Sequence, residues 1–233
     1  MDASNHRRLT GDRLAAVAYW PARMETAADC GIRLAKCLTA LGAAGPKFSA
    51  WYRLGRGSTA TELKPVVVDA GHLAEILQRG RNRRDTDRGV IEQLGFQCAF
   101  LNSHRMAGAV SLHATCGIYS ENQRLWNAVV VSPLDPGSLG CGVAVELVRA
   151  AVAAWQPQWA AVCTRSALRA RAAGHMPVVD WVVYVRLAAV PTLPPPARSA
   201  FVDGGPCVVV RETPHGGEGA LFHAGEVARS LGI

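Results

Sequence analysis

Long apolar runs are missing from this chain. Runs such as Leu14–Trp20 are far shorter than the roughly 20 residues that a membrane-spanning helix requires. A signal peptide is not expected, because the apolar run after Arg13 is short, ends at Trp20-Pro21 and is followed by no small-residue cleavage site. The sequence therefore predicts a cytoplasmic protein with no membrane partner.

Closely spaced metal ligands are also missing. The cysteines are odd in number and scattered, at Cys30, Cys37, Cys98, Cys116, Cys141, Cys163 and Cys207. No C-x-x-C or H-x-x-x-H pair occurs, and zinc sites need such spacing. We expect reduced, mostly buried thiols, no metal site and no cofactor.

Charged residues are scarce, at 18% of the chain, and aromatic residues make up 6%. By contrast, 49% of the residues are apolar, which is enough for a substantial core. The net charge is +7, and only three of the 25 basic residues are lysines. A basic surface favours either nucleic acid or an acidic protein partner, and the charge alone does not separate the two.

No catalytic constellation is found. Glu62-Leu63-Lys64 imitates the E-x-K of metal-dependent nucleases, but the predicted strand Leu14–Trp20 offers no second carboxylate. Gly55–Thr59 contains G-x-G without the strand-to-helix context of a phosphate loop. No serine or cysteine nucleophile motif occurs. The sequence predicts that the protein is not an enzyme.

Apolar periodicity predicts both strands and helices along the chain. Thr26 with Asp29 is a candidate capping pair for a helix that ends near 42–46, and Asp69 is a candidate cap for a helix closed by Gly80. Further helices are expected at 142–155, at 166–173 and before Leu231. Strands are expected at 14–20, 96–102, 109–116, 127–132, 159–164, 181–187 and 207–212.

These elements do not alternate as regular β-α-β units. We therefore expect a single α+β domain over residues 14–233, in which helices pack against a mainly antiparallel sheet. Residues 1–13 are polar and charged and are expected to form a flexible N-terminal leader.

The most informative local feature is the polar stretch that follows the helix ending at Gly80. Arginine suits bidentate binding of carboxylate or phosphate, so the stretch is a candidate surface for binding a partner. The alternatives are a solvated loop and a structural clasp on the preceding helix end. Asp85 and Asp87 lie among five arginines, which favours an ion-pair network over a cation site. The candidate residues are Arg79, Arg81, Asn82, Arg83, Arg84 and Asp85.

Several short motifs occur in an order that is similar to the immunity protein 52 family of bacterial polymorphic toxin systems. They are Tyr19-Trp20 with Arg23, Gly80-Arg81-Asn82-Arg83 with Asp85, Trp181–Tyr184 and Leu193–Pro196. The resemblance spans about residues 17–200. Trp181 and Tyr184, three positions apart in a predicted strand, are expected to lie on opposite faces and to serve the fold.

The resemblance implies a protein that binds and neutralises a cognate nuclease toxin with a restriction-endonuclease-like domain, often delivered by type VI secretion. It implies no cofactor and no catalytic residue. The alternative from the composition is a basic nucleic-acid-binding protein. The salt dependence of the binding affinity distinguishes these two functions, because an affinity that rests on phosphate contacts falls steeply as the salt concentration rises.

Overall fold

The chain folds into one large sheet with helices on both faces. The computed structural model describes residues 12–54, 63–102, 109–122, 125–171, 177–186, 192–202, 205–210 and 219–232. The strands are β1 (Leu14–Trp20), β2 (Tyr52–Leu54), β3 (Leu63–Pro65), β4 (Phe96–Leu101), β5 (Ser111–Cys116), β6 (Asn127–Leu134), β7 (Trp159–Thr164), β8 (Val182–Val185), β9 (Arg198–Val202) and β10 (Gly205–Val209). The helices are α1 (Ala27–Ala44), α2 (Ala70–Arg79), α3 (Cys141–Trp155), α4 (Arg165–Arg171) and α5 (Gly219–Ser230), with short 3-10 turns η1 (Pro46–Phe48) and η2 (Glu92–Leu94).

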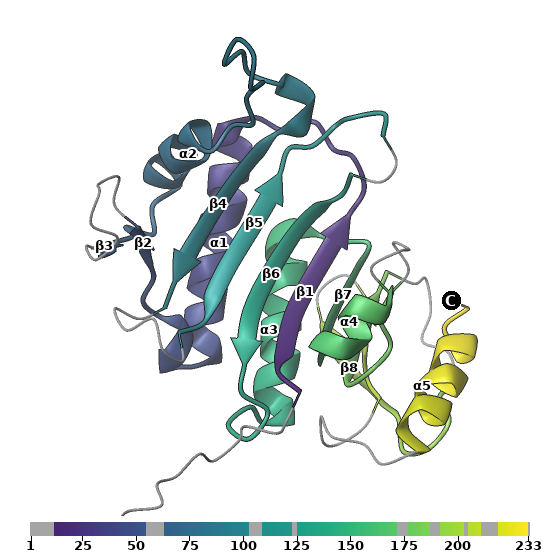
Figure 1. Cartoon of the computed structure of the whole chain (residues 1–233). Coiled ribbons are helices and arrows are strands. Elements are labelled where there is room, and N and C mark those ends of the chain that lie inside the picture. The colour runs from purple at the N-terminus through teal and green to yellow at the C-terminus, as the bar shows by residue number, and fades with distance from the viewer. Residues whose placement is uncertain are drawn as a thin grey trace, which may run out of the picture.

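The ten strands form an open sheet in the order β3-β2-β4-β5-β6-β1-β7-β8-β10-β9. The paired strands run antiparallel to each other, and β4, β5 and β6 form the meander expected from the sequence. The N-terminal strand β1 lies in the middle, where Val17 is opposite Val130 of β6 and Ala161 of β7. The predicted single-domain α+β fold is confirmed (Figure 1).

Helices α1, α2 and α3 cover one face of the sheet (Figure 1). The predicted cap of α1 is confirmed: Thr26 Oγ1 accepts a hydrogen bond from the backbone N–H of Asp29 (3.1 Å), and the Asp29 carboxylate accepts one from the Thr26 N–H (3.0 Å). The Thr26 hydroxyl also donates to the Asp29 carboxylate (2.6 Å), and this bond, followed by the one from the Thr26 N–H, lowers the pKa of Asp29. At Gly31 a Cβ would lie 2.5 Å from the Ala70 carbonyl oxygen, so the glycine lets α1 and α2 approach closely.

The opposite face is covered over only part of its width. A second apolar cluster, with Val17, Trp159 and Val183 at its centre, packs under α4, α5 and the segment around Val178. The cluster lies on β1, β7, β8 and β10, and Val130 of β6 packs against its edge. The strands β4 and β5 contribute no residue to it, so their outward side chains are left without a helix above them in the described part of the chain.

Trp181 and Tyr184 are both fully buried, as expected, but the prediction that they point to opposite faces is wrong. Strand β8 begins at Val182, so Trp181 lies one residue before the strand and does not follow the strand's alternation of side-chain directions. Both side chains join the cluster beneath α1–α3, whereas Val183 faces the other way.

Only part of the predicted leader is described. Residues 1–11 lie outside the described ranges, whereas Asp12 accepts a hydrogen bond from the Ser166 N–H (3.0 Å) and the Arg13 carbonyl accepts one from the Arg165 N–H (2.8 Å). Among the described helices, none is long and apolar enough to cross a bilayer.

Candidate functional site

The uncovered part of the sheet forms a regular platform, here called the open face. It consists of three rows of side chains across β4, β5 and β6, on the side opposite α1–α3. The positions in these rows are Gln97, Thr115 and Ala128; Ala99, His113 and Val130; and Leu101, Ser111 and Ser132. Gln97, Ala99 and His113 are exposed and the others are half-buried.

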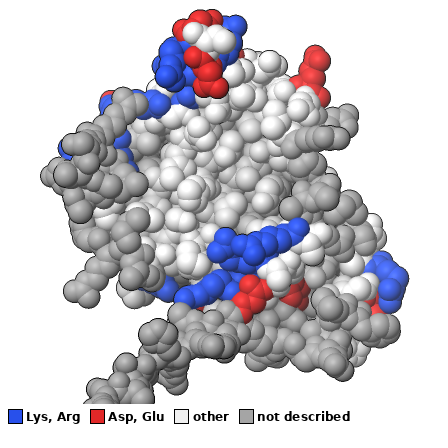
Figure 2. Space-filling view, in the orientation of Figure 1, with Lys and Arg blue, Asp and Glu red and all other residues white. Residues whose placement is uncertain are grey.

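None of the nine positions of the open face is Asp, Glu, Lys or Arg. Figure 2 shows this as a broad uncharged surface across the middle of the molecule, with Lys, Arg, Asp and Glu gathered at its upper end and along its lower edge. This segregation is unexpected in a chain with a net charge of +7. The open face is therefore suited to contact with an uncharged surface.

The predicted site residues lie at the upper end of the open face, in a loop here called the arginine hairpin (residues 80–91). Its two arms are joined by hydrogen bonds from the Ile91 N–H to the Asn82 carbonyl (2.9 Å) and from the Arg84 N–H to the Gly89 carbonyl (2.8 Å). Gly80 starts the hairpin where α2 ends, and a Cβ there would lie 1.9 Å from the Gln97 carbonyl oxygen. Only glycine permits this close approach.

Two of the predicted site residues hold the hairpin in place. Asn82 Nδ2 donates to the Leu94 carbonyl (3.1 Å), and Asn82 Oδ1 accepts from Gln97 Nε2 (3.3 Å). Arg81 is ion-paired with Glu92 and lies over the Phe96 ring, with its Cζ 5.8 Å from the ring centroid. These contacts tie the base of the hairpin to η2 and β4, whereas the clasp considered from the sequence would have joined arginines to the carbonyls at the end of α2.

The remaining candidates point to solvent. Arg79 pairs with Glu75 one helical turn earlier (3.1 Å), so it belongs to the surface of α2. Arg84 Nε lies 3.3 Å from Asp87 Oδ1, with both side chains 58% exposed. Arg83 donates to the Arg88 carbonyl (3.0 Å) and has no carboxylate partner within the described residues. The exposed charged residues of the hairpin are thus Arg83, Arg84, Asp85, Asp87 and Arg88.

A hollow of about 430 Å³ lies between the arginine hairpin and the segment after β5. Its lining includes Arg84, Val90, Ile91 and Tyr119. Tyr119 is held there by a hydrogen bond from its N–H to the Gln93 carbonyl (3.1 Å), and 39% of the residue is exposed. The hollow is of mixed polarity, because Glu92 and Gln93 also line it. An exposed tyrosine beside such a hollow is a common anchor point in protein interfaces.

Arg23, from the first motif, belongs to a buried ionic cluster on the helix side. The side chain of Glu25 is 7% exposed, and its carboxylate pairs with Arg23 (2.9 Å) and Arg33 (2.6 Å). The two arginines also donate to the last carbonyls of α3, Trp155 (3.1 Å) and Ala154 (3.0 Å). The cluster caps a helix end and ties three segments together, which gives the motif a structural role.

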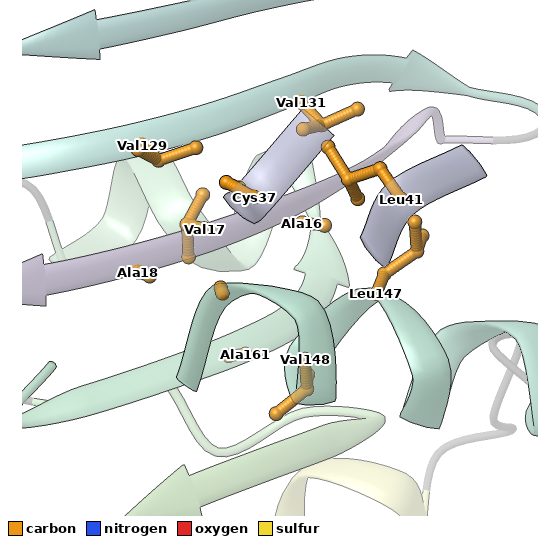
Figure 3. A pocket seen from close by; sticks show the side chains of 11 residues that line it. Ala16, Val17, Ala18, Cys37, Leu41, Val129, Val131, Leu147, Val148 and Ala161 are labelled. Atoms are coloured by element: carbon orange, nitrogen blue, oxygen red, sulfur yellow. The ribbon is translucent and has the colours of Figure 1, made fainter. Parts of the chain in front are cut away.

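The described residues contain no group of three His, Cys, Asp or Glu that could hold a metal ion. Glu62, of the E-x-K pattern, lies outside them, and Lys64 lies in the short strand β3. A small void of about 10 Å³ lies between α1, α3 and the sheet. Figure 3 shows the apolar side chains that line it. Its volume is about that of one water molecule.

Sequence reasoning missed the open face and Tyr119. The signal was present in part: Ser111, His113 and Thr115 alternate with buried residues, and none of the three carries a formal charge. The alternation within one strand does not show which strands lie beside it, so the platform formed by three strands could not be predicted from this pattern.

Comparison with known proteins gives one result that covers most of the chain. The family model Immunity protein 52 matches residues 12–214. No curated protein matches the sequence. The match includes the open face, the arginine hairpin and the Arg23 cluster. The chain belongs to the immunity protein 52 family, whose members are the immunity components of toxin–immunity systems.

Proposed function

We propose that this immunity protein binds a cognate nuclease toxin of the restriction-endonuclease-like class and blocks it without any catalysis of its own. The toxin is a type VI secretion effector of a polymorphic toxin system, and the complex forms in the cytoplasm, where a nuclease finds its substrate. The proposal is supported by the family match over residues 12–214 and by the motifs shared with that family.

The observation that carries the proposal is the uncharged open face beside an exposed arginine pair. A protein partner can cover such a platform with little loss of hydration, because few charges have to be desolvated. Arg83 and Arg84 at its border are suited to pairing with acidic groups of the toxin.

The charge of the chain bears on the way the toxin is inhibited. An inhibitor that imitates nucleic acid across its whole surface needs a strongly negative surface, whereas this chain carries +7. Inhibition therefore proceeds through a local protein–protein interface and not through mimicry of DNA or RNA.

Co-expression tests the proposal. The toxin domain encoded beside this gene is induced with and without this protein, and cell survival and chromosomal integrity are measured. We expect survival with intact DNA only when the immunity protein is present, and no cleavage of DNA or RNA by the purified immunity protein with Mg²⁺. Toxin killing that this protein does not reduce, or metal-dependent cleavage by the protein itself, would contradict the proposal.

A further inference from the structure

We propose that the open face is the centre of the toxin interface, and that it binds a flat, uncharged surface of the toxin and not its nucleic-acid groove. The arginine hairpin and the Tyr119 hollow then form the border of the same interface. This inference rests on the proposed function, because it assigns the surface that the toxin uses.

The chemistry of the nine positions favours burial by a partner. Four are apolar (Ala99, Leu101, Ala128 and Val130) and five are uncharged polar residues (Gln97, Ser111, His113, Thr115 and Ser132). The Ser111 hydroxyl already donates to the Ser132 carbonyl (2.7 Å), so covering it removes no essential hydrogen bond to water. Charged residues are depleted from the centres of protein interfaces in the same way.

The platform is also rigid before any partner arrives. Strands β4, β5 and β6 pair without a register break over the three rows. The alternate residues of the same strands, such as Phe100, Leu112 and Val129, are buried under the helix layer. Binding to a fixed surface of this kind requires little ordering of side chains or backbone, which favours affinity.

The size of the platform indicates that it is only part of the interface. With strands about 4.8 Å apart and rows about 6.8 Å apart, nine positions cover roughly 300 Å². A standard interface buries about 800 Å² on each partner. The hollow at Tyr119 and the hairpin adjoin the platform, since Gln97 is hydrogen-bonded to Asn82 (3.3 Å), and they supply the additional contact area.

Charge complementarity determines which toxin surface fits. A nuclease binds phosphates with a basic groove, and the hairpin end of this chain is also basic, with Arg83 lacking a carboxylate partner among the described residues. Two basic surfaces repel each other, so the basic groove is a poor match for this region. A toxin surface that is uncharged opposite the open face and acidic opposite Arg83 and Arg84 matches both the open face and the arginine hairpin.

A pair of matched substitutions tests the inference. Ala99→Arg introduces a charge on the open face, and Ala43→Arg introduces the same charge at an exposed position of α1 on the other side of the sheet. Binding to the catalytically inactive toxin domain from the adjacent gene is measured by surface plasmon resonance, together with the melting temperature and the size-exclusion profile of each variant.

We expect Ala99→Arg to weaken toxin binding more than tenfold, mainly through faster dissociation, and Ala43→Arg to leave it within twofold, with both melting temperatures close to that of the wild type. Wild-type affinity in a folded Ala99→Arg variant overturns the inference while leaving the proposed function intact. A wild-type dimer that Ala99→Arg dissociates without change in toxin affinity also overturns it, because the platform then serves self-association. Failure of the wild type to bind the toxin rejects the proposed function itself.

Discussion

At the scale of single residues, the cysteines behave as small buried apolar groups. Burial raises the pKa of Cys37 and of Cys98 to about 12, and burial likewise raises the pKa of Cys207 to about 12. The hydrogen bond with Cys30, followed by burial, raises the pKa of Cys116. Thiols held in the protonated form are poor nucleophiles, so a redox or catalytic role for these side chains is disfavoured.

The raised pKa values predict a loss of stability in alkali. An unfolded thiol loses its proton near pH 9, whereas the folded chain keeps the Cys37 proton to about pH 12. Unfolding then releases protons in this window, and the free energy of unfolding falls by up to about 1.4 kcal/mol per pH unit for each such thiol. Urea unfolding under reducing conditions from pH 8 to 11 measures the slope.

Cys37→Ala provides the control for this prediction, because it removes one titrating thiol and leaves the other titrating groups unchanged. We expect its unfolding free energy to fall less steeply with pH than that of the wild type. Equal slopes for the two proteins would show that the buried thiol does not contribute.

At the scale of elements, the arginine hairpin combines a fixed base with exposed charges. Replacing Arg83 and Arg84 by Glu should slow association with the toxin and weaken binding by several kcal/mol through like-charge repulsion and lost hydrogen bonds. Stability should change by less than about 1 kcal/mol, since both side chains are exposed.

Lys36→Glu with Lys47→Glu is a matched control, because it changes the net charge by the same amount at two exposed positions outside the hairpin. Stopped-flow association rates and melting temperatures are compared among the three proteins. Unaltered affinity of the hairpin variant would exclude its role in the interface, and a large drop in its melting temperature would identify Arg83 and Arg84 as part of the clasp.

The junction between η2 and β4 depends on one glycine. Gly95 has φ of +57°, and a Cβ there would lie 2.2 Å from the Cys116 carbonyl oxygen. Gly95→Ala should cost at least about 2 kcal/mol of stability, because strain adds to a steric clash. Gly142→Ala in α3 meets nothing within 4 Å and should stabilise by up to about 1 kcal/mol. Urea unfolding checks both, and a neutral Gly95→Ala would contradict the structure at this turn.

Elements with strong local signals were predictable from the sequence. Strand β1 ends before Pro21 as expected, β7 matches residues 159–164, and the caps at Thr26 and Asp69 are confirmed. The short strands β2, β3 and β9 were missed, because pairing with neighbours and not local composition makes them strands. The open face was not predictable for a related reason: it depends on which strands lie side by side and on where α4 and α5 pack.

At the scale of the whole molecule, the uneven distribution of charge separates two modes of binding. The uncharged platform in Figure 2 is unsuited to phosphates, although the chain as a whole is basic. We expect toxin affinity to change less than tenfold between 0.05 and 0.5 M salt. We expect duplex DNA to bind only weakly, with an affinity that falls steeply over the same range. Fluorescence anisotropy with a labelled duplex measures the second quantity, and tight DNA binding at 0.15 M salt would favour a nucleic-acid-binding protein.

The central position of β1 has a consequence for the timing of protection. This strand is made early in synthesis, yet it pairs with β6 and β7, as in the contacts of Tyr19 with Ala128 and Trp159. In a nascent chain, β1 therefore lacks its first partner until residue 134 has been made and its second partner until residue 164 has been made, and non-local pairing of this kind is slow. Protease resistance of pulse-labelled nascent chains should appear only after β7 has left the ribosome. We therefore expect a cell that meets an incoming toxin to be protected mainly by molecules completed beforehand, so that the standing pool of this protein sets its resistance more than new synthesis does.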